Sequence, residues 1–161
     1  NQGNEEISLS LMLSRTPSAN ERVKPIANGV EIDVQYADLK GNAITIDKLQ
    51  QGEEFLAKIR VKKTNDSSPS MALTYAIPSG WEIWNERLTG GEESQGATYT
   101  DIRDTSISWY FAIEQGQTKE FVVRLRAAYG GQFILPPTIC EDMYNPSCRA
   151  NTANGLTIVV R

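Results

Sequence analysis

The sequence contains no histidine among its 161 residues. Histidine is the commonest general base and the commonest metal ligand in proteins. Its absence excludes a Ser-His-Asp triad and a Cys-His nucleophile pair. Cysteine is scarce as well, because Cys140 and Cys148 are the only two, too few to hold a structural zinc ion without histidine. We therefore expect no catalytic residues, no metal site and no cofactor.

The sequence also lacks a long apolar run and an excess of positive charge. No stretch approaches the roughly 20 apolar residues that a membrane helix needs. The 16 basic and 20 acidic residues give a net charge of −4, whereas a nucleic-acid-binding domain usually presents a basic face. The first methionine is Met12, from which we expect a processed chain or a piece of a larger exported protein.

What the sequence does contain is alternation of apolar and polar residues, which is typical of strands with one buried face. Gly-, Pro- and Asn-rich turns separate these segments, and no helix-period segment is present. The pattern predicts one all-β domain, an antiparallel β-sandwich. The expected strands cover residues 7–14, 30–36, 55–62, 71–77, 106–113 and 121–127, with shorter ones at 132–135 and 156–160.

Two segments without a strand pattern suggest how the chain is organised. Residues 16–28 mix proline, serine, asparagine and charged residues, as a linker does, and residues 88–98 are rich in glycine and glutamate, as in a loop. We therefore predict that residues 1–27 form an N-terminal strand and linker joining from a preceding domain. The sandwich itself would then span residues 28–161.

The segment that holds the two cysteines is the unusual part of the sequence. Pro136 and Pro137 cannot donate hydrogen bonds to a sheet, so they should end the strand before them. Cys140 and Cys148 lie close together in a polar, turn-rich stretch, which favours a local disulfide and an oxidising compartment. Free thiols in a cytosolic protein are the alternative.

Between the cysteines lie Met143, Tyr144 and Pro146. A disulfide would stabilise the ring that contains them by roughly 2–3 kcal/mol in the chain-entropy model. A rigid loop with a tyrosine at its tip suits a contact surface, and a purely structural turn is the alternative.

Other candidate residues have ordinary explanations. Paired carboxylates, such as Glu141 and Asp142, point to opposite faces of a strand and are expected to be solvated. Trp109 and Phe111 fall on the apolar face of a predicted strand and should lie in the core, whereas Trp81 and Trp84 follow a turn and are expected to cap one end of the sandwich.

Four stretches of the chain resemble one known family. They are residues 28–38, residues 49–63, residues 76–88 with the sequence AIPSGWEIWNERL, and the series FILPP, EDMYNP and RA between residues 133 and 150. In these stretches the chain is similar to the C-terminal, tenth macroglobulin-like domain of bacterial alpha-2-macroglobulins. The last stretch is the most specific.

The resemblance implies a macroglobulin- or fibronectin-like sandwich within a large protease-trapping parent, a periplasmic or cell-envelope protein and lipoprotein. In such parents a Cys-Gln thioester captures proteases. The residues three after Cys140 and Cys148 are Met143 and Asn151 rather than Gln, so this chain cannot carry that bond.

The family's thioester belongs to another domain, against which this non-catalytic domain packs. Tyr144 matches the tyrosine that shields the thioester from water, with Met143 and Pro146 beside it in the interface. The implied partners are neighbouring domains of the parent, above all the thioester domain, and target proteases indirectly. Contact with nucleic acid is not expected, and contact with a membrane only through a lipid anchor elsewhere in the parent. The alternative is a free-standing adhesion or ligand-binding sandwich of a cell-surface protein.

Overall fold

A computed structural model describes residues 8–16, 21–84 and 96–160. Within these ranges the chain forms strands and no helix. Short turns join most of the strands, as expected for a small all-β domain. The strands are β1 (Ile26–Asn28), β2 (Val30–Ala37), β3 (Leu49–Gln50), β4 (Glu54–Lys63), β5 (Ser70–Ala76), β6 (Trp81–Ile83), β7 (Tyr99–Arg103), β8 (Ser106–Ala112), β9 (Thr118–Ala127), β10 (Gly131–Leu135), β11 (Ile139–Asp142), β12 (Arg149–Asn151) and β13 (Gly155–Val160).

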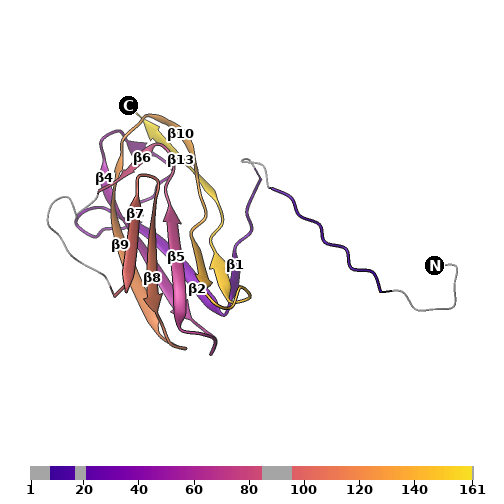
Figure 1. The fold of residues 1–161 in the computed structure, drawn as a ribbon. Coiled ribbons are helices and arrows are strands. Elements are labelled where there is room, and N and C mark those ends of the chain that lie inside the picture. Colours follow the sequence, from indigo (N-terminus) through magenta and orange to yellow (C-terminus); the bar gives the residue numbers. More distant parts are fainter. Residues whose placement is uncertain (1–7, 17–20, 85–95, 161) are drawn as a thin grey trace.

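The strands form two main sheets that pack face to face, together with a smaller third one (Figure 1). One main sheet has the order β1-β12-β11-β5-β8-β7, the other β2-β4-β9-β6, and the small sheet β10-β13-β3. Neighbouring strands are antiparallel except β13 and β3, which are parallel. The predicted all-β antiparallel sandwich is thus confirmed.

The core lies between the two main sheets. Along β4 the side chains of Phe55, Ala57, Ile59 and Val61 are fully buried, because alternate residues of a strand share one face. Trp109 of β8 packs against Phe121 of β9, with ring centroids 5.0 Å apart. This ring pair joins the two sheets at the level of the side chains, as aromatic pairs do in sandwich cores.

The core positions of the tryptophans agree with the sequence patterns in part. Trp109 and Phe111 are buried as expected. Trp81 is also buried, in contact with Phe55 at a centroid distance of 4.9 Å. Trp84 lies at the surface, 39% exposed, and stacks under the guanidinium of Arg124 at 4.7 Å.

Three expectations about the first hundred residues need correction or fall outside the described ranges. Residues 8–14 do not form the predicted strand; they extend away from the sandwich (Figure 1), and Leu9 is 88% exposed, because no strand lies beside them to complete a ladder. The predicted linker ends in a strand, since Ile26–Asn28 pairs with β12 as β1. Most of the predicted loop at 88–98 lies in the undescribed segment 85–95.

The described part of the chain contains no helix with the length and apolar character needed to cross a membrane.

Candidate functional site

The predicted loop between the two cysteines is the turn of a β-hairpin, whose two short strands were not predicted. Its strands are β11 and β12, in which Cys140 pairs with Ala150 and Glu141 with Arg149. The Asp142 N–H then donates to the Cys148 carbonyl at 2.9 Å. Pro136 and Pro137 directly follow β10, as expected. The sequence hid this hairpin because its strands are short and each exposes polar residues.

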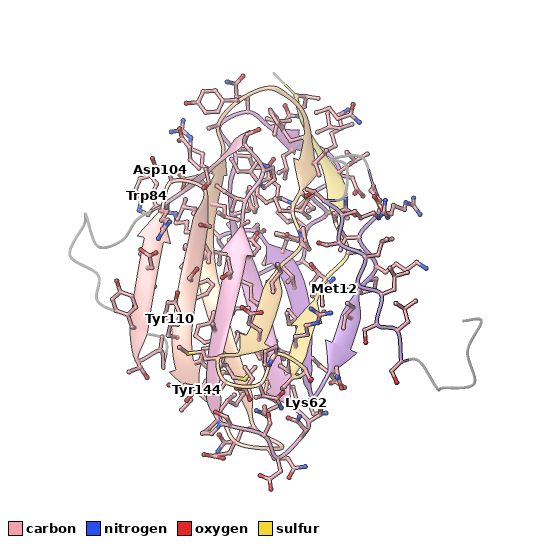
Figure 2. All side chains as sticks on the ribbon, turned by 45° about the vertical axis from the view of Figure 1, so that its right-hand side comes forward. Met12, Lys62, Trp84, Asp104, Tyr110 and Tyr144 are labelled. Atoms are coloured by element: carbon pink, nitrogen blue, oxygen red, sulfur yellow. The ribbon has the colours of Figure 1, made fainter. Side chains whose placement is uncertain are left out.

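The tip of this hairpin carries the predicted contact residues. We call residues 143–147 the tyrosine turn. Tyr144 is 76% exposed and Met143 50% exposed, and Pro146 is exposed as well. In Figure 2, Tyr144 lies toward the lower end of the domain, as Lys62 does, and Trp84 lies toward the opposite end. An aromatic ring and a thioether exposed to water forgo the free energy that burial of their apolar surface would release. This turn is therefore a candidate contact surface.

Asp142 holds the backbone of the tyrosine turn in place. Its Oδ1 accepts hydrogen bonds from the N–H groups of Tyr144 at 2.9 Å and of Asn145 at 3.0 Å. The Asn145 side chain in turn accepts from the Ser147 N–H at 3.2 Å. This is an Asx turn, in which the oxygen of a short Asp or Asn side chain accepts hydrogen bonds from backbone N–H groups in place of a backbone carbonyl.

The environment of Asp142 favours its ionised form. Burial by itself raises the pKa of this carboxyl, but hydrogen bonds from the Tyr144 N–H and the Ser67 hydroxyl outweigh it and leave the pKa below its ordinary value of 3.8. The expectation that Glu141 and Asp142 are both solvated is therefore wrong for Asp142, which is 3% exposed.

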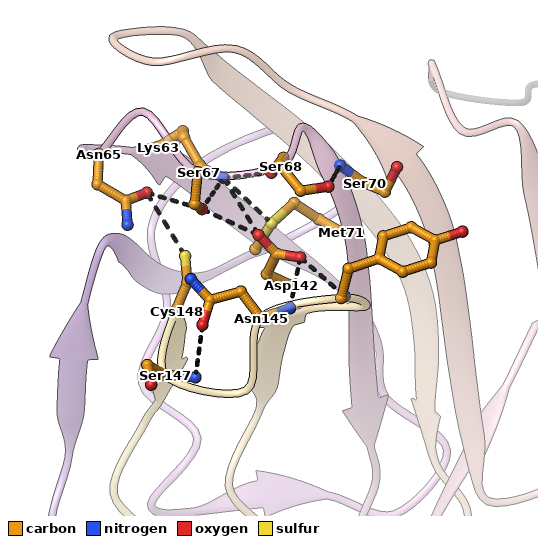
Figure 3. A network of polar contacts seen from close by, with 11 residues as sticks. Lys63, Asn65, Ser67, Ser68, Ser70, Met71, Asp142, Asn145, Ser147 and Cys148 are labelled. Atoms are coloured by element: carbon orange, nitrogen blue, oxygen red, sulfur yellow. Dashed lines mark hydrogen bonds and ion pairs between the residues drawn. The ribbon is translucent and has the colours of Figure 1, made fainter.

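A buried lysine faces the same carboxylate from the opposite sheet. Lys63 ends β4 and is fully buried. Its Nζ donates to the Ser67 hydroxyl at 2.8 Å and to the Ser68 carbonyl at 2.6 Å, and lies 3.9 Å from Asp142 Oδ2. Ser67 donates to the same Asp142 oxygen at 2.9 Å (Figure 3). Neither charged residue was predicted to matter.

A signal for both residues was present in the sequence. Lys63 continues the buried series Phe55, Ala57, Ile59 and Val61 in steps of two, and Asp142 occupies the same face of β11 as Cys140. A charged residue at a position that continues an apolar face of a strand is either exposed at the end of the strand or buried beside a partner.

The two cysteines are free thiols in the structure and both are buried. They sit on the diagonal of the hairpin, since Cys140 faces Ala150, two residues beyond Cys148. The structure does not show the predicted bond, which stays a prediction. The argument that these residues lie outside the core is wrong.

Burial also governs the chemistry of the first thiol. It raises the pKa of Cys140 to about 12, with further contributions from Cys148 and Glu141. A thiol with so high a pKa has almost no thiolate at neutral pH and reacts slowly. The Cys148 thiol donates weakly to Asn65 Oδ1 at 3.5 Å, so the network behind the tyrosine turn includes one of the cysteines.

The described residues also form a concave surface beside β1 and β2, at one edge of the sandwich. It is an open groove of about 820 Å³ lined by parts of β1, β2 and the segments 135–138 and 151–153. Charges of both signs line it, including Asp33 and Arg60. In the residues that the structure describes, no group of three histidine, cysteine or carboxylate side chains is placed to bind a metal ion.

The fold and the exposed turn define a β-sandwich module with one candidate contact surface. Residues 29–147 match the family described as the bacterial alpha-2-macroglobulin MG10 domain. The chain belongs to this family, which confirms the resemblance seen in the sequence. It is a family of domains from bacterial alpha-2-macroglobulins.

Relatives and solved structures agree with this assignment. The alpha-2-macroglobulin of Pasteurella multocida is 26% identical over 88% of this chain, which spans 7% of that protein. The crystal structure of native Escherichia coli alpha-2-macroglobulin from domain MG7 to the C-terminus matches with a TM-score of 0.77 and 26% identity, over 85% of this chain and 24% of the other. Salmonella alpha-2-macroglobulin reacted with methylamine matches with a TM-score of 0.78 and 25% identity, over 88% of this chain and 10% of the other.

Proposed function

We propose that this chain is the tenth macroglobulin-like domain of a bacterial alpha-2-macroglobulin and that it packs against the thioester domain of its parent. In this proposal it is a non-catalytic part of a protease trap. Tyr144, with Met143 and Pro146 beside it, covers the thioester until a protease cleaves the parent. The observation that carries the proposal is the 76% exposed ring of Tyr144 on a backbone turn that Asp142 holds in place.

A tyrosine suits this task for two physical reasons. Its ring is a flat apolar cover, and its hydroxyl can make one hydrogen bond beside the protected group. A thioester held in a dry interface hydrolyses slowly because water cannot reach it. The Salmonella relative reacts with methylamine, a small amine nucleophile, and we propose the same reactivity for the parent of this chain.

The proposal also gives a place to the N-terminal residues. Leu9, Leu11 and Leu13 are each at least 86% exposed and fall on one side of an extended segment. We propose that residues 1–27 link this domain to the preceding one, and that this leucine face forms a strand against that domain. Residues 28–161 are then the sandwich proper, and the end of the linker adds β1 to its edge by pairing with β12.

The remaining parts of the proposal concern the parent. We propose a periplasmic or cell-envelope location, with a lipid anchor elsewhere in the parent as its contact with a membrane. Target proteases meet this domain only indirectly, through the neighbouring domains. The family match favours this function over a free-standing adhesion module.

Methylamine uptake by the uncleaved full-length parent tests the shield. Tyr144→Ala should raise the uptake rate by about tenfold or more, which corresponds to about 1.4 kcal/mol of lost protection. Tyr99→Ala is the matched control, since Tyr99 is also an exposed tyrosine, 61% exposed on the edge strand β7. Equal rates for the native protein and Tyr144→Ala, or a parent that takes up no methylamine at all, would refute the shield.

A further inference from the structure

Lys63 and Asp142 form an ion pair that has no contact with water. Both side chains are fully buried, with Nζ 3.9 Å from Oδ2. Taking two charges out of water is costly unless hydrogen bonds satisfy them. Here Ser67 meets that need, since its hydroxyl accepts from Lys63 at 2.8 Å and donates to Asp142 at 2.9 Å. The ammonium, the hydroxyl and the carboxylate therefore form a closed chain of contacts.

The two oxygens of Asp142 face different parts of the molecule. Oδ2 faces the buried Ser67 hydroxyl and the Lys63 ammonium. Oδ1 faces the tyrosine turn and accepts from the N–H groups of Tyr144 and Asn145. Figure 3 shows this division, with Asp142 between Lys63 and the turn at Asn145. One carboxylate thus connects the end of β4 to the backbone of the tyrosine turn.

Few other contacts restrain the turn from inside the domain. The Met143 N–H donates to the Ser70 carbonyl at 3.0 Å, and the Cys148 N–H donates to the Asn145 carbonyl at 2.9 Å. The Asn28 side chain also donates to the Ser147 carbonyl at 2.7 Å. These three bonds fix the two ends of the turn. The Tyr144 N–H has its bond to Asp142, so the position of the Tyr144 backbone depends on the position of that carboxylate.

We propose that Lys63 and Asp142 are positioning residues for the shielding surface: the buried ammonium fixes the Asp142 carboxylate, and the carboxylate fixes the tyrosine turn in the orientation that covers the thioester. This inference rests on the proposed function, because the turn must have something to cover. Lys63 acts at a distance, through Asp142, and does not touch the protected bond.

A purely structural ion pair would stabilise the domain without orienting the turn, so the test needs a local readout. The first measurement is hydrogen exchange at the Tyr144 and Asn145 amides in the full-length parent. The variant Lys63→Met with Asp142→Ala removes both charges together, so no lone buried charge remains. We expect it to speed exchange at both amides by about tenfold or more, as for loss of a charge-assisted hydrogen bond.

Two further variants control for loss of stability. Thr157→Val removes a buried hydrogen bond, from Thr157 Oγ1 to the Ile46 carbonyl at 2.6 Å, in the small sheet rather than at the turn. It should leave exchange at the turn unchanged. Lys63→Met alone keeps the Asp142 acceptor but removes the ammonium that fixes it, so it supplies the result if the double variant does not fold. Unchanged exchange at both turn amides in folded Lys63→Met and in the folded double variant would overturn the proposal.

Methylamine uptake by the uncleaved parent then separates this inference from the proposed function. If both are right, Tyr144→Ala and the Lys63→Met/Asp142→Ala variant each raise the rate by about tenfold or more, and Thr157→Val does not. If Tyr144→Ala raises the rate and the double variant leaves it unchanged, the shield stands and the positioning role is wrong. If Tyr144→Ala has no effect, the proposed function itself is wrong.

Discussion

Removing the buried ammonium of Lys63 should cost the domain a large share of its stability. Lys63→Met shortens the side chain by only one atom, but it leaves the Asp142 carboxylate buried without a cation. Loss of one partner of a buried pair costs about 3–5 kcal/mol. Asp142 keeps its bonds from Ser67, Tyr144 and Asn145, so we expect about 3 kcal/mol. A domain of this size has about 5–15 kcal/mol in total, so the variant should still fold.

The second half of this prediction is a double-mutant cycle. Asp142→Asn alone leaves the ammonium without a counter-charge, and the two changes together leave neither charge. The double variant should therefore be more stable than the sum of the single losses implies, by about 1–3 kcal/mol. Urea unfolding of the 161-residue chain, followed by fluorescence of the buried Trp81 and Trp109, measures this. Additivity within about 0.5 kcal/mol would refute the idea that the two charges interact.

Three further predictions concern pH, the cysteines and a glycine. Because the pKa of Asp142 is lowered in the folded state, its ionised form contributes to the stability of the fold above pH 3.8, and this contribution is lost as the pH falls further. The stability difference between the native chain and Asp142→Asn should therefore shrink from pH 5 to pH 3 in urea titrations. The disulfide predicts that protein folded under oxidising conditions shows no alkylated cysteine when it is unfolded in urea without reductant and treated with iodoacetamide. Two alkylated cysteines would contradict the disulfide. In reduced native protein, Cys140 should alkylate slowly because its pKa is raised to about 12. Gly29→Ala should lower stability by about 1–3 kcal/mol, and by more than Gly116→Ala. Both glycines have positive φ, 74° and 79°, but only at Gly29 would the new Cβ lie 2.3 Å from Asn65. Equal losses of stability in thermal unfolding would contradict this.

The strands that the sequence predicted are those with one continuous apolar face. β4 is the clearest case, since its alternate residues from Phe55 to Val61 are all fully buried, and period-two alternation records burial on one side directly. β11 and β12 were missed because their buried residues, Cys140 and Ala150, are few and small. Residues 7–14 have the same alternation as β4, but alternation cannot tell which sheet a strand joins.

The candidate site shows a similar division. Tyr144 could be selected from the sequence because its motif resembles that of a known family, and its exposure agrees with a contact role. Lys63 and Asp142 were missed because charged residues are almost never fully buried without a partner. The two residues are each other's partner, and they lie 79 positions apart in the chain (142 − 63). Patterns among neighbouring residues cannot reveal a contact over that separation.

The most direct test of the central claim is a cross-link from position 144 in the uncleaved parent. A photoreactive phenylalanine analogue placed there should join covalently to the segment that carries the thioester cysteine. The same analogue at position 99, on the edge strand β7, should not, and protease cleavage of the parent should reduce the cross-link at 144. Absence of any cross-link from position 144 to the thioester segment before cleavage, in a parent that takes up methylamine, would contradict the account.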